Sequence, residues 1–459
     1  MIELLPLMLF GFVFVVLLVG YPVAFALSGS ALLFALIGFV TDTFDPVFLE
    51  AIPNRIQGIL SNELLIAIPL FVFMGVMLEK SKIAEELLDT MGQVFGGKPG
   101  GLGLSVLIVG MLLAASTGIV GATVVTMGLL ALPTMLKRGY SPEVATGVIC
   151  ASGTLGQIIP PSIVLVLLGD VISSAYQQAQ LDQGIFAPES VTVGDLFLGA
   201  LIPGMLLVAL YAIYIIAIAV INPAKVPPIP EDERKVSKEL WMQVLTVLVP
   251  PISLIILVLG SILGGIATPT EAASVGSVGA IILAKFKKTL NLKILKGVLQ
   301  STTEVTAMVF MILIGASVFS LVFRGFGGDD LVRDFLMNLP GGVFGAVFLV
   351  MLVMFLLGFF LDFIEITFVV IPIVAPILLS MGLDPVWLGI MIALNLQTSF
   401  LTPPFGFSLF YLRGVAPDSI ATTQIYRGVI PFIMIQLIVI GMLAYCPRLA
   451  TWLPNAVYG

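Results

Sequence analysis

Residues 152–162 read SGTLGQIIPPS and place two adjacent prolines, Pro160 and Pro161, inside an otherwise apolar segment. Neither proline has a backbone N–H, and in an α-helix each ring would clash with the carbonyl group four residues earlier. We therefore predict a helix over 141–168 that is broken near its middle. The break leaves backbone carbonyl groups near Gly156 and Gln157 without helical partners.

The composition of the whole chain indicates that this broken helix lies in a membrane. Of the 459 residues, 59% are hydrophobic and only 10% are charged, and the mean hydropathy is +1.17. Soluble domains carry about 25% charged residues, and apolar runs long enough to span a bilayer recur along this sequence. We therefore expect an all-α integral membrane protein.

The residue types argue against three other classes of protein. The chain has no basic patch with interleaved aromatic residues, so we expect no nucleic acid partner. It has no histidine, the commonest general base, and only Asp362 and Glu365 offer a reactive pair within the apolar segments, so we do not expect an enzyme. A channel is less favoured, because a fixed pore usually presents a ring of charged or carbonyl groups.

The proline pattern occurs twice, with a constant separation of 243 residues. The first set is Pro133, Gly139, Pro142, Pro160 and Pro161, and the second is Pro376, Gly382, Pro385, Pro403 and Pro404. The hydropathy around the two sets also matches. We therefore divide the chain into two repeats, 1–240 and 241–459.

Each repeat is predicted to contain scaffold helices, an interfacial helix, a hairpin of two apolar segments, a broken helix and a final helix. The hairpins could instead be pairs of full crossings, because both arrangements return the chain to the side it left. We expect about ten full spans and two re-entrant hairpins. The first repeat has scaffold helices within 3–79, the interfacial helix 81–98, the hairpin 101–136, the broken helix 141–168 and the helix 197–221. The second repeat has scaffold helices within 241–323, the interfacial helix 325–341, the hairpin 341–380, the broken helix 384–412 and the helix 424–446.

Charged residues in the loops predict the orientation. The segment 285–296 carries five lysines and no acid, which places it in the cytoplasm, whereas 170–195 carries four acids and no basic residue, which places it outside. Both termini are then periplasmic, and the segment 22–40 runs outward while its counterpart 268–284 runs inward. The repeats are therefore predicted to be inverted. Inverted repeats with interrupted helices are the architecture of secondary transporters.

Small and hydroxylated residues cluster at the first hairpin tip and at the first break. Freed carbonyl groups need partners in an apolar interior, and a hard cation such as sodium prefers a shell of oxygen atoms. The alternatives are tight packing of small residues between helices and a helix that is merely kinked. The residues predicted for this first sodium site are Ser116, Thr117, Gly118, Ser152, Gly153, Thr154 and Gly156.

The second hairpin and the second break, NLQTSFLTPPFG at 395–406, form a corresponding candidate site. Asp362 lies in an apolar setting, where a carboxylate is costly unless it is paired or ion-bound. It could neutralise a cation or carry a proton, although a structural ion pair or an interfacial position would also account for it. The residues predicted for the second sodium site are Asp362, Asn395, Gln397, Thr398 and Thr402.

Few basic side chains are available to bind an anionic substrate. Arg324 and Arg413 lie at span ends, and we expect them to anchor at the interface. The helix N-termini at the breaks carry partial positive charge and can hold an anionic group instead. The residues predicted near the substrate are Ser116, Gln157, Ser162, Asn395, Pro403 and Gly406.

Four motifs in order carry a resemblance to a known family. They are GGIATPTEA at 264–272, GQIIPPS at 156–162, FLD at 360–362, and Asn395 followed by TPP at 402–404. Together they resemble the large membrane subunit of tripartite ATP-independent periplasmic (TRAP) transporters, over nearly the whole chain. Many members of that family have glycine where this chain has Ser399, and another residue at Gln397, which leaves the coordination at the second site open.

The resemblance implies an elevator mechanism, in which a domain with two hairpins slides against a scaffold. It implies sodium-driven uptake of an organic acid, either a carboxylate (2-oxo acids included) or a sulfonate. It also implies a bacterial inner-membrane location, a small four-helix membrane subunit and a periplasmic substrate-binding protein as partners. The alternative is a stand-alone symporter of similar architecture that needs no binding protein.

Overall fold

The computed structural model describes residues 4–230 and 238–458, and within these ranges every regular element is a helix. Most of the predicted segments appear with ends that differ by only a few residues. The segment 231–237, just before the predicted boundary between the repeats, lies outside the described residues, as do residues 1–3 and 459.

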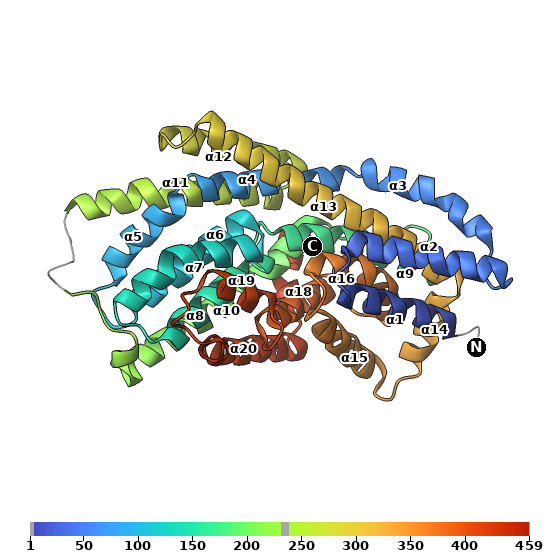
Figure 1. The fold of residues 1–459 in the computed structure, drawn as a ribbon. Coiled ribbons are helices and arrows are strands. Elements are labelled where there is room, and N and C mark those ends of the chain that lie inside the picture. Colours follow the sequence, from blue (N-terminus) through green and yellow to red (C-terminus); the bar gives the residue numbers. More distant parts are fainter. Residues whose placement is uncertain (1–3, 231–237, 459) are drawn as a thin grey trace.

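One bundle is formed by the helices predicted as the scaffold (Figure 1). Helix α12 packs against α4, α13 packs against both α2 and α4, and α11 lies beside α12. Many apolar side chains on these helices face outward, as expected for helices in contact with lipid. The helices are α1 (Leu5–Leu18), α2 (Val23–Val40), α4 (Ala67–Lys80), α11 (Lys238–Leu263), α12 (Pro269–Phe286) and α13 (Leu292–Gly325).

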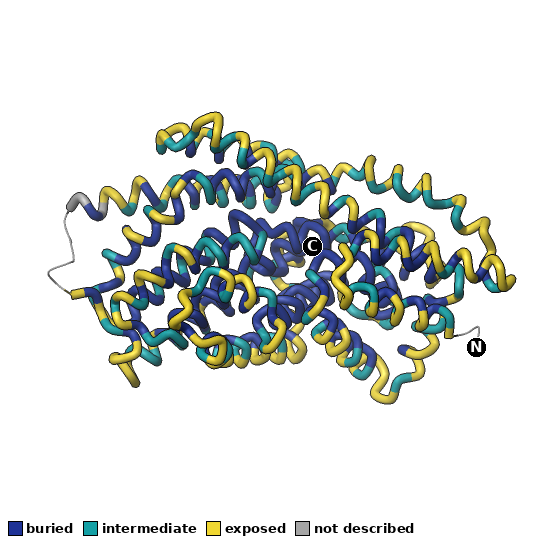
Figure 2. The backbone as a smooth tube through the Cα atoms, in the orientation of Figure 1, coloured by how far each residue is buried: buried dark blue, intermediate teal, exposed yellow. Residues whose placement is uncertain are grey.

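The second bundle contains both hairpins and both broken helices. Its centre is the most buried part of the molecule (Figure 2), and every residue of α18 is buried. The helices from the first repeat are α6 (Gly101–Thr117), α7 (Val120–Lys137), α8 (Pro142–Thr154), α9 (Ile163–Asp182) and α10 (Val193–Ile221). Those from the second are α15 (Gly342–Leu357), α16 (Phe363–Val369), α17 (Ile371–Ser380), α18 (Pro385–Leu401), α19 (Phe407–Val415) and α20 (Thr422–Tyr445).

Two helices were not predicted from the sequence, α3 (Ile52–Leu60) and α21 (Arg448–Tyr458). Both are short and amphipathic, so a search for long apolar runs passes over them. The second apolar segment of the hairpin predicted over 341–380 is not a single helix, because Pro372 opens a separate helix α17, and α16 and α17 meet at a bend of 58°. Proline at this position lacks the N–H that would continue the preceding helix.

Helix length supports a membrane protein without deciding the number of spans. In the described part of the chain, six helices are long and apolar enough to cross a bilayer, or up to eight if α3–α4 and α16–α17 each count as one bent span. Four shorter apolar helices, α1, α6, α15 and α18, add to these. The expected total of about ten spans and two re-entrant hairpins therefore stays a prediction.

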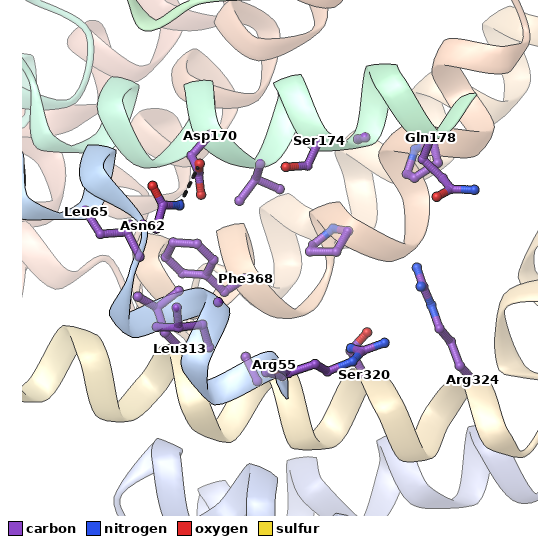
Figure 3. Close-up of a pocket in the computed structure, with 18 residues that line it drawn as sticks. Arg55, Asn62, Leu65, Asp170, Ser174, Gln178, Leu313, Ser320, Arg324 and Phe368 are labelled. Atoms are coloured by element: carbon purple, nitrogen blue, oxygen red, sulfur yellow. Dashed lines mark hydrogen bonds between the residues drawn. The ribbon is translucent and has the colours of Figure 1, made fainter. Parts of the chain in front are cut away.

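The two bundles meet around a cavity of about 420 Å³ (Figure 3). Its walls come from α3 and α13 on one side and from α9, α16 and α17 on the other. Outside this cavity, polar side chains also join the bundles directly, since Thr126 Oγ1 on α7 donates to Glu79 Oε1 on α4 at 3.0 Å.

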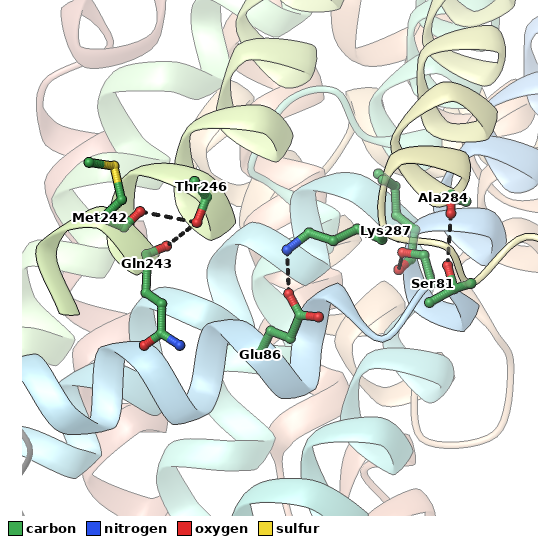
Figure 4. A network of polar contacts seen from close by, with 9 residues as sticks. Ser81, Glu86, Met242, Gln243, Thr246, Ala284 and Lys287 are labelled. Carbon is green, nitrogen blue, oxygen red and sulfur yellow. Dashed lines mark hydrogen bonds and ion pairs between the residues drawn. The ribbon is translucent and has the colours of Figure 1, made fainter. Parts of the chain in front are cut away.

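The predicted interfacial helices appear as α5 (Ile83–Phe95) and α14 (Gly328–Met337), two amphipathic arms between the bundles. Lys287, at the end of α12, forms an ion pair with Glu86 of α5 (Figure 4). On the other arm, Arg333 of α14 pairs with Asp182 at the end of α9 at 2.7 Å. Charged side chains thus tie each arm to a neighbouring helix end.

Replacement of Gly315 by alanine should destabilise the scaffold bundle. A Cβ at this position of α13 would lie 2.4 Å from the backbone oxygen of Ala24 in α2, and such overpacking costs about 1–3 kcal/mol. We expect a lower melting temperature for the purified Gly315→Ala protein. Gly29→Ala on α2 is the control, because its Cβ would meet nothing within 4 Å. Equal melting temperatures for the two variants would contradict the close approach of α2 and α13.

Candidate functional site

Both predicted helix breaks are present. Helix α8 ends at Thr154, the 3-10 turn η4 covers Leu155–Gln157, and α9 begins only at Ile163. In the second repeat, α18 ends at Leu401 and α19 begins at Phe407. The Pro160–Pro161 and Pro403–Pro404 peptide bonds are both cis. The first break is buried throughout, whereas Pro404 and Phe405 of the second are exposed.

Side-chain hydroxyl groups donate hydrogen bonds to some of the backbone carbonyl groups that lose their helical partners at the prolines. The Ser162 hydroxyl donates to the carbonyl oxygen of Gly156 at 2.7 Å, and Ser408 donates to that of Phe400 at 2.8 Å. The carbonyl oxygen of Gly156 therefore already has one partner within the protein. Because a carbonyl oxygen has two lone pairs, it still has capacity for a second partner.

The first hairpin tip lies directly across the first break. Helix α6 ends at Gly118, which has a positive φ of 63° that suits glycine. A Cβ on Gly118 would lie 3.1 Å from the backbone nitrogen of Ile163, and one on Gly156 would lie 2.8 Å from the carbonyl oxygen of Ala114. The backbone of the tip is therefore in contact with both sides of the break.

The hydroxylated residues of the first candidate site can still accept a cation. Each of three side chains donates its hydrogen to the carbonyl group three residues earlier, at 2.9–3.1 Å, so its oxygen keeps acceptor capacity. Thr154 uses part of that capacity, because it accepts from Gln397 Nε2 at 3.5 Å. Thr117 instead shares a hydrogen bond of 2.9 Å with Thr123, across the hairpin. Gly153 lies against Val124. The three side chains are Ser116, Ser152 and Thr154.

At the second hairpin tip, Asp362 caps a helix. Its carboxylate accepts the N–H of Phe363 at 2.7 Å, and Glu365 accepts the N–H of Asp362 at 2.9 Å, so the two acids form a capping box at the start of α16. The ring of Phe360 packs 5.3 Å from that of Phe405, which brings the tip to the second break. In the described ranges, Asp362 makes no hydrogen bond with the other residues predicted for its site.

The polar residues of α18 have two different kinds of partner. Asn395 and Ser399 donate across to α15, to the carbonyl oxygens of Met351 at 2.8 Å and Phe355 at 2.7 Å. The hydroxyls of Thr398 and Thr402 donate within their own chain segment, to Leu394 and Thr398. Asn395 and Ser399 therefore help to hold the second hairpin against the broken helix.

The two broken helices touch through equivalent positions of the two predicted repeats. Gln397 Nε2 lies 3.5 Å from Thr154 Oγ1, and these residues are 243 positions apart. Beside this contact, Gln397 Oε1 and both polar atoms of the Gln157 side chain are fully buried without a hydrogen-bond partner among the described residues. A buried polar atom without a partner costs about 1–3 kcal/mol, so these amides indicate a place for water or a ligand.

Some helix starts near the breaks are capped by a side chain and others are not. Ser141, Asp384 and Asp362 cap α8, α18 and α16 with their side chains. No side chain caps α9 or α19, which begin after Ser162 and Gly406. The first N–H groups and the positive end of the helix dipole are therefore left free at both breaks. Pro403, also predicted near the substrate, is partly exposed in the loop before α19.

Tyr411 of α19 is a residue near the site that was not predicted from the sequence. A Cβ on Gly121 of α7 would lie 2.9 Å from the Tyr411 ring. It falls inside the predicted broken helix 384–412, but no motif distinguishes it there.

Comparison with known proteins identifies a family whose sequences match this chain. Residues 10–449 match the family described as the DctM component of the tripartite ATP-independent periplasmic transporter. The chain is 30% identical to the C4-dicarboxylate TRAP transporter large permease protein DctM of Vibrio cholerae, over 98% of both chains. It is 27% identical to the sialic acid TRAP transporter large permease protein SiaM of the same species, over 96% of this chain and 97% of that one. In fold, it is similar to the YdaH transporter of Alcanivorax borkumensis, with a TM-score of 0.59, 14% identity and 88% of each chain covered.

Replacement of Gln157 by leucine tests whether its amide serves the fold. Because the buried amide has no protein partner, an apolar side chain of similar size should leave stability unchanged or raise it by about 1–3 kcal/mol. We expect thermal melting of the purified Gln157→Leu protein to occur at the wild-type temperature or above. A clear fall in melting temperature would show that the amide is paired inside the folded protein.

Proposed function

This chain belongs to the family of DctM components of tripartite ATP-independent periplasmic transporters, and we propose that it carries an organic acid across the bacterial inner membrane together with sodium. The main support is the set of buried polar atoms without a hydrogen-bond partner between the two breaks, namely both polar atoms of the Gln157 side chain and the side-chain oxygen of Gln397. They occupy the point where two broken helices meet two hairpin tips. A fold that needed only stability would place apolar side chains there.

The two sodium sites are proposed from their oxygen atoms. The first site uses the hydroxyl lone pairs at the tip of α6 and the end of α8, together with the second lone pair of the freed carbonyl groups, as hard cations prefer. In the second, Asp362 supplies charge from the hairpin tip, and the side-chain oxygens of the break supply the shell. The residues are Ser116, Thr117, Gly118, Ser152, Gly153, Thr154 and Gly156 for the first, and Asp362, Asn395, Gln397, Thr398 and Thr402 for the second.

The substrate anion is proposed to lie at the uncapped helix starts. Free N–H groups at the start of α9 and α19 can donate to a carboxylate, aided by the helix dipoles. The side chains of Gln157 and Asn395 are placed to add hydrogen bonds, with Ser116, Ser162, Pro403 and Gly406 around them. The two curated relatives carry different acids in their names, a C4-dicarboxylate and sialic acid. Membership of the family therefore does not identify which acid this chain transports.

The proposed motion is that of an elevator. The buried second bundle would move as one body against the scaffold, with α5 and α14 as the connecting arms. The two repeats, 1–240 and 241–459, would be inverted, with both termini in the periplasm. A small four-helix membrane subunit and a periplasmic substrate-binding protein would complete the transporter and deliver the acid.

Two replacements of Asp362 separate its charge from its role as a helix cap. Asparagine caps helices as well as aspartate does, whereas alanine costs about 0.5–2 kcal/mol at this position. If the charge binds sodium, Asp362→Asn should abolish sodium-driven uptake in proteoliposomes while the transporter still assembles, and Asp362→Ala should do the same with a lower melting temperature. Normal uptake by the asparagine variant would assign Asp362 to the cap alone.

The coupling ion is tested by uptake in proteoliposomes that hold this chain with its two proposed partners. Uptake should require an inward sodium gradient and stop when an ionophore removes it. The Gln157→Leu protein, which is expected to fold normally, should lose this uptake. Transport that persists without the gradient would refute sodium coupling, and transport by this chain alone would favour a stand-alone symporter.

A further inference from the structure

The cavity between the two bundles is separate from the breaks and contains two arginines (Figure 3). Arg55 enters it from α3 and Arg324 from α13, and none of its lining residues belongs to 152–162 or 395–406. The side chain of Arg324, which we expected to anchor at the interface, points into this cavity. The cavity lies along the end of α9 that leads to the loop predicted to be outside.

The two arginines have few partners in the protein. Arg55 is partly buried, and its guanidinium group makes no hydrogen bond or ion pair with any described residue. Arg324 Nε is held by Asp329 at 2.6 Å, which leaves the two terminal nitrogens of its guanidinium group for another partner. By contrast, Lys287 at the end of α12 and Arg333 on the arm α14 are both paired. The two positive groups repel each other, and Asp329, which lies near both arginines, offsets part of that repulsion. A bound anion would offset more of it.

The end of the cavity away from Arg324 contains an acidic residue instead. Asp170 lies there and accepts a hydrogen bond of 3.1 Å from Asn62 Nδ2. Asp170 and Gln178 are eight residues apart on α9, which corresponds to about 12 Å along the helix, and Gln178 lies near the Arg324 end. The cavity is therefore basic at one end and acidic at the other. A ligand with a negative group at each end would be repelled by Asp170.

We propose that this cavity is a reception site that binds the carboxylate of the organic acid between Arg55 and Arg324 before the acid reaches the breaks. It favours acids whose far end is neutral or donates a hydrogen bond, such as hydroxy acids, over acids with a second carboxylate there. The guanidinium fork matches the two oxygens of a carboxylate, and such charge-assisted bonds are stronger than neutral ones. The order of binding rests on the proposed function and on the predicted orientation.

The site is tested by binding to the purified full chain in nanodiscs of zwitterionic phosphatidylcholine. The probes are 6-hydroxyhexanoate and adipate, which have the same carbon chain and differ at one end. Calorimetry should show tighter binding of the hydroxy acid. Arg55→Gln and Arg324→Gln should each weaken its binding by about tenfold or more, the usual effect of losing a charged hydrogen bond. Arg427→Gln, an exposed arginine of α20 outside the cavity, is the matched control and should bind as wild type.

The acidic end is tested by Asp170→Asn, which should bring the affinity for adipate closer to that for 6-hydroxyhexanoate. Equal binding by wild type and both arginine variants, or no binding by wild type, would overturn the proposal. If phosphatidylglycerol in the nanodiscs displaces the probe from wild type and is itself held by the arginines, the cavity is a lipid headgroup site and the proposal also fails.

These binding measurements need neither sodium nor partner proteins, so their failure is distinct from failure of the proposed function. The Gln157→Leu protein provides the complementary case. It should bind 6-hydroxyhexanoate like wild type while uptake is lost. Loss of probe binding in this variant would mean that the probe occupies the breaks and would overturn a separate reception site.

Discussion

Backbone groups freed by two adjacent prolines in an apolar interior are the constraint on which this structure depends. Water is not available there, so each freed carbonyl or N–H group must find a partner inside the protein or in a ligand. At the first break, the Ser162 hydroxyl meets the carbonyl oxygen of Gly156, and the tip of the hairpin packs so closely that only glycine fits at the contact. The close packing of the hairpin tip against the break thus follows from the need to shield these backbone groups.

The same constraint accounts for the choice of polar side chains at the centre. Amides and hydroxyls satisfy backbone groups without bringing a net charge into the interior, and their remaining lone pairs stay available. The two acids that do enter, Asp362 and Glu365, hold the start of α16. The starts of α9 and α19, which face the breaks, have no side-chain cap, so their first N–H groups remain available as donors.

Arginine and lysine are absent from the breaks at 152–162 and 395–406, and two arginines lie in the cavity between the bundles. A helix end can attract an anion with partial charges alone, and it binds the anion less strongly than an arginine does. Weak binding at the breaks and stronger reception at Arg55 and Arg324 would suit a protein that must release what it carries. The similarity to the YdaH transporter, at 14% identity, concerns the fold and does not indicate a substrate.

The sequence by itself determined the helical class, the position of both breaks and nearly all helices of the second bundle. It could do so because proline chemistry and apolar length are local properties, and a break at Pro160 needs no knowledge of distant residues. The short amphipathic helices α3 and α21 were missed because length was the main signal.

Only the tertiary structure decided which polar groups are paired. The cap formed by Asp362, the contact of Gln397 with Thr154 and the cavity position of Arg324 all depend on segments far apart in the chain. Hydropathy along the sequence does not record such contacts, because burial and pairing are properties of the packed helices. The same sequence signal, a polar residue in an apolar segment, therefore corresponds to a cap at Asp362 and to an unpaired amide at Gln157.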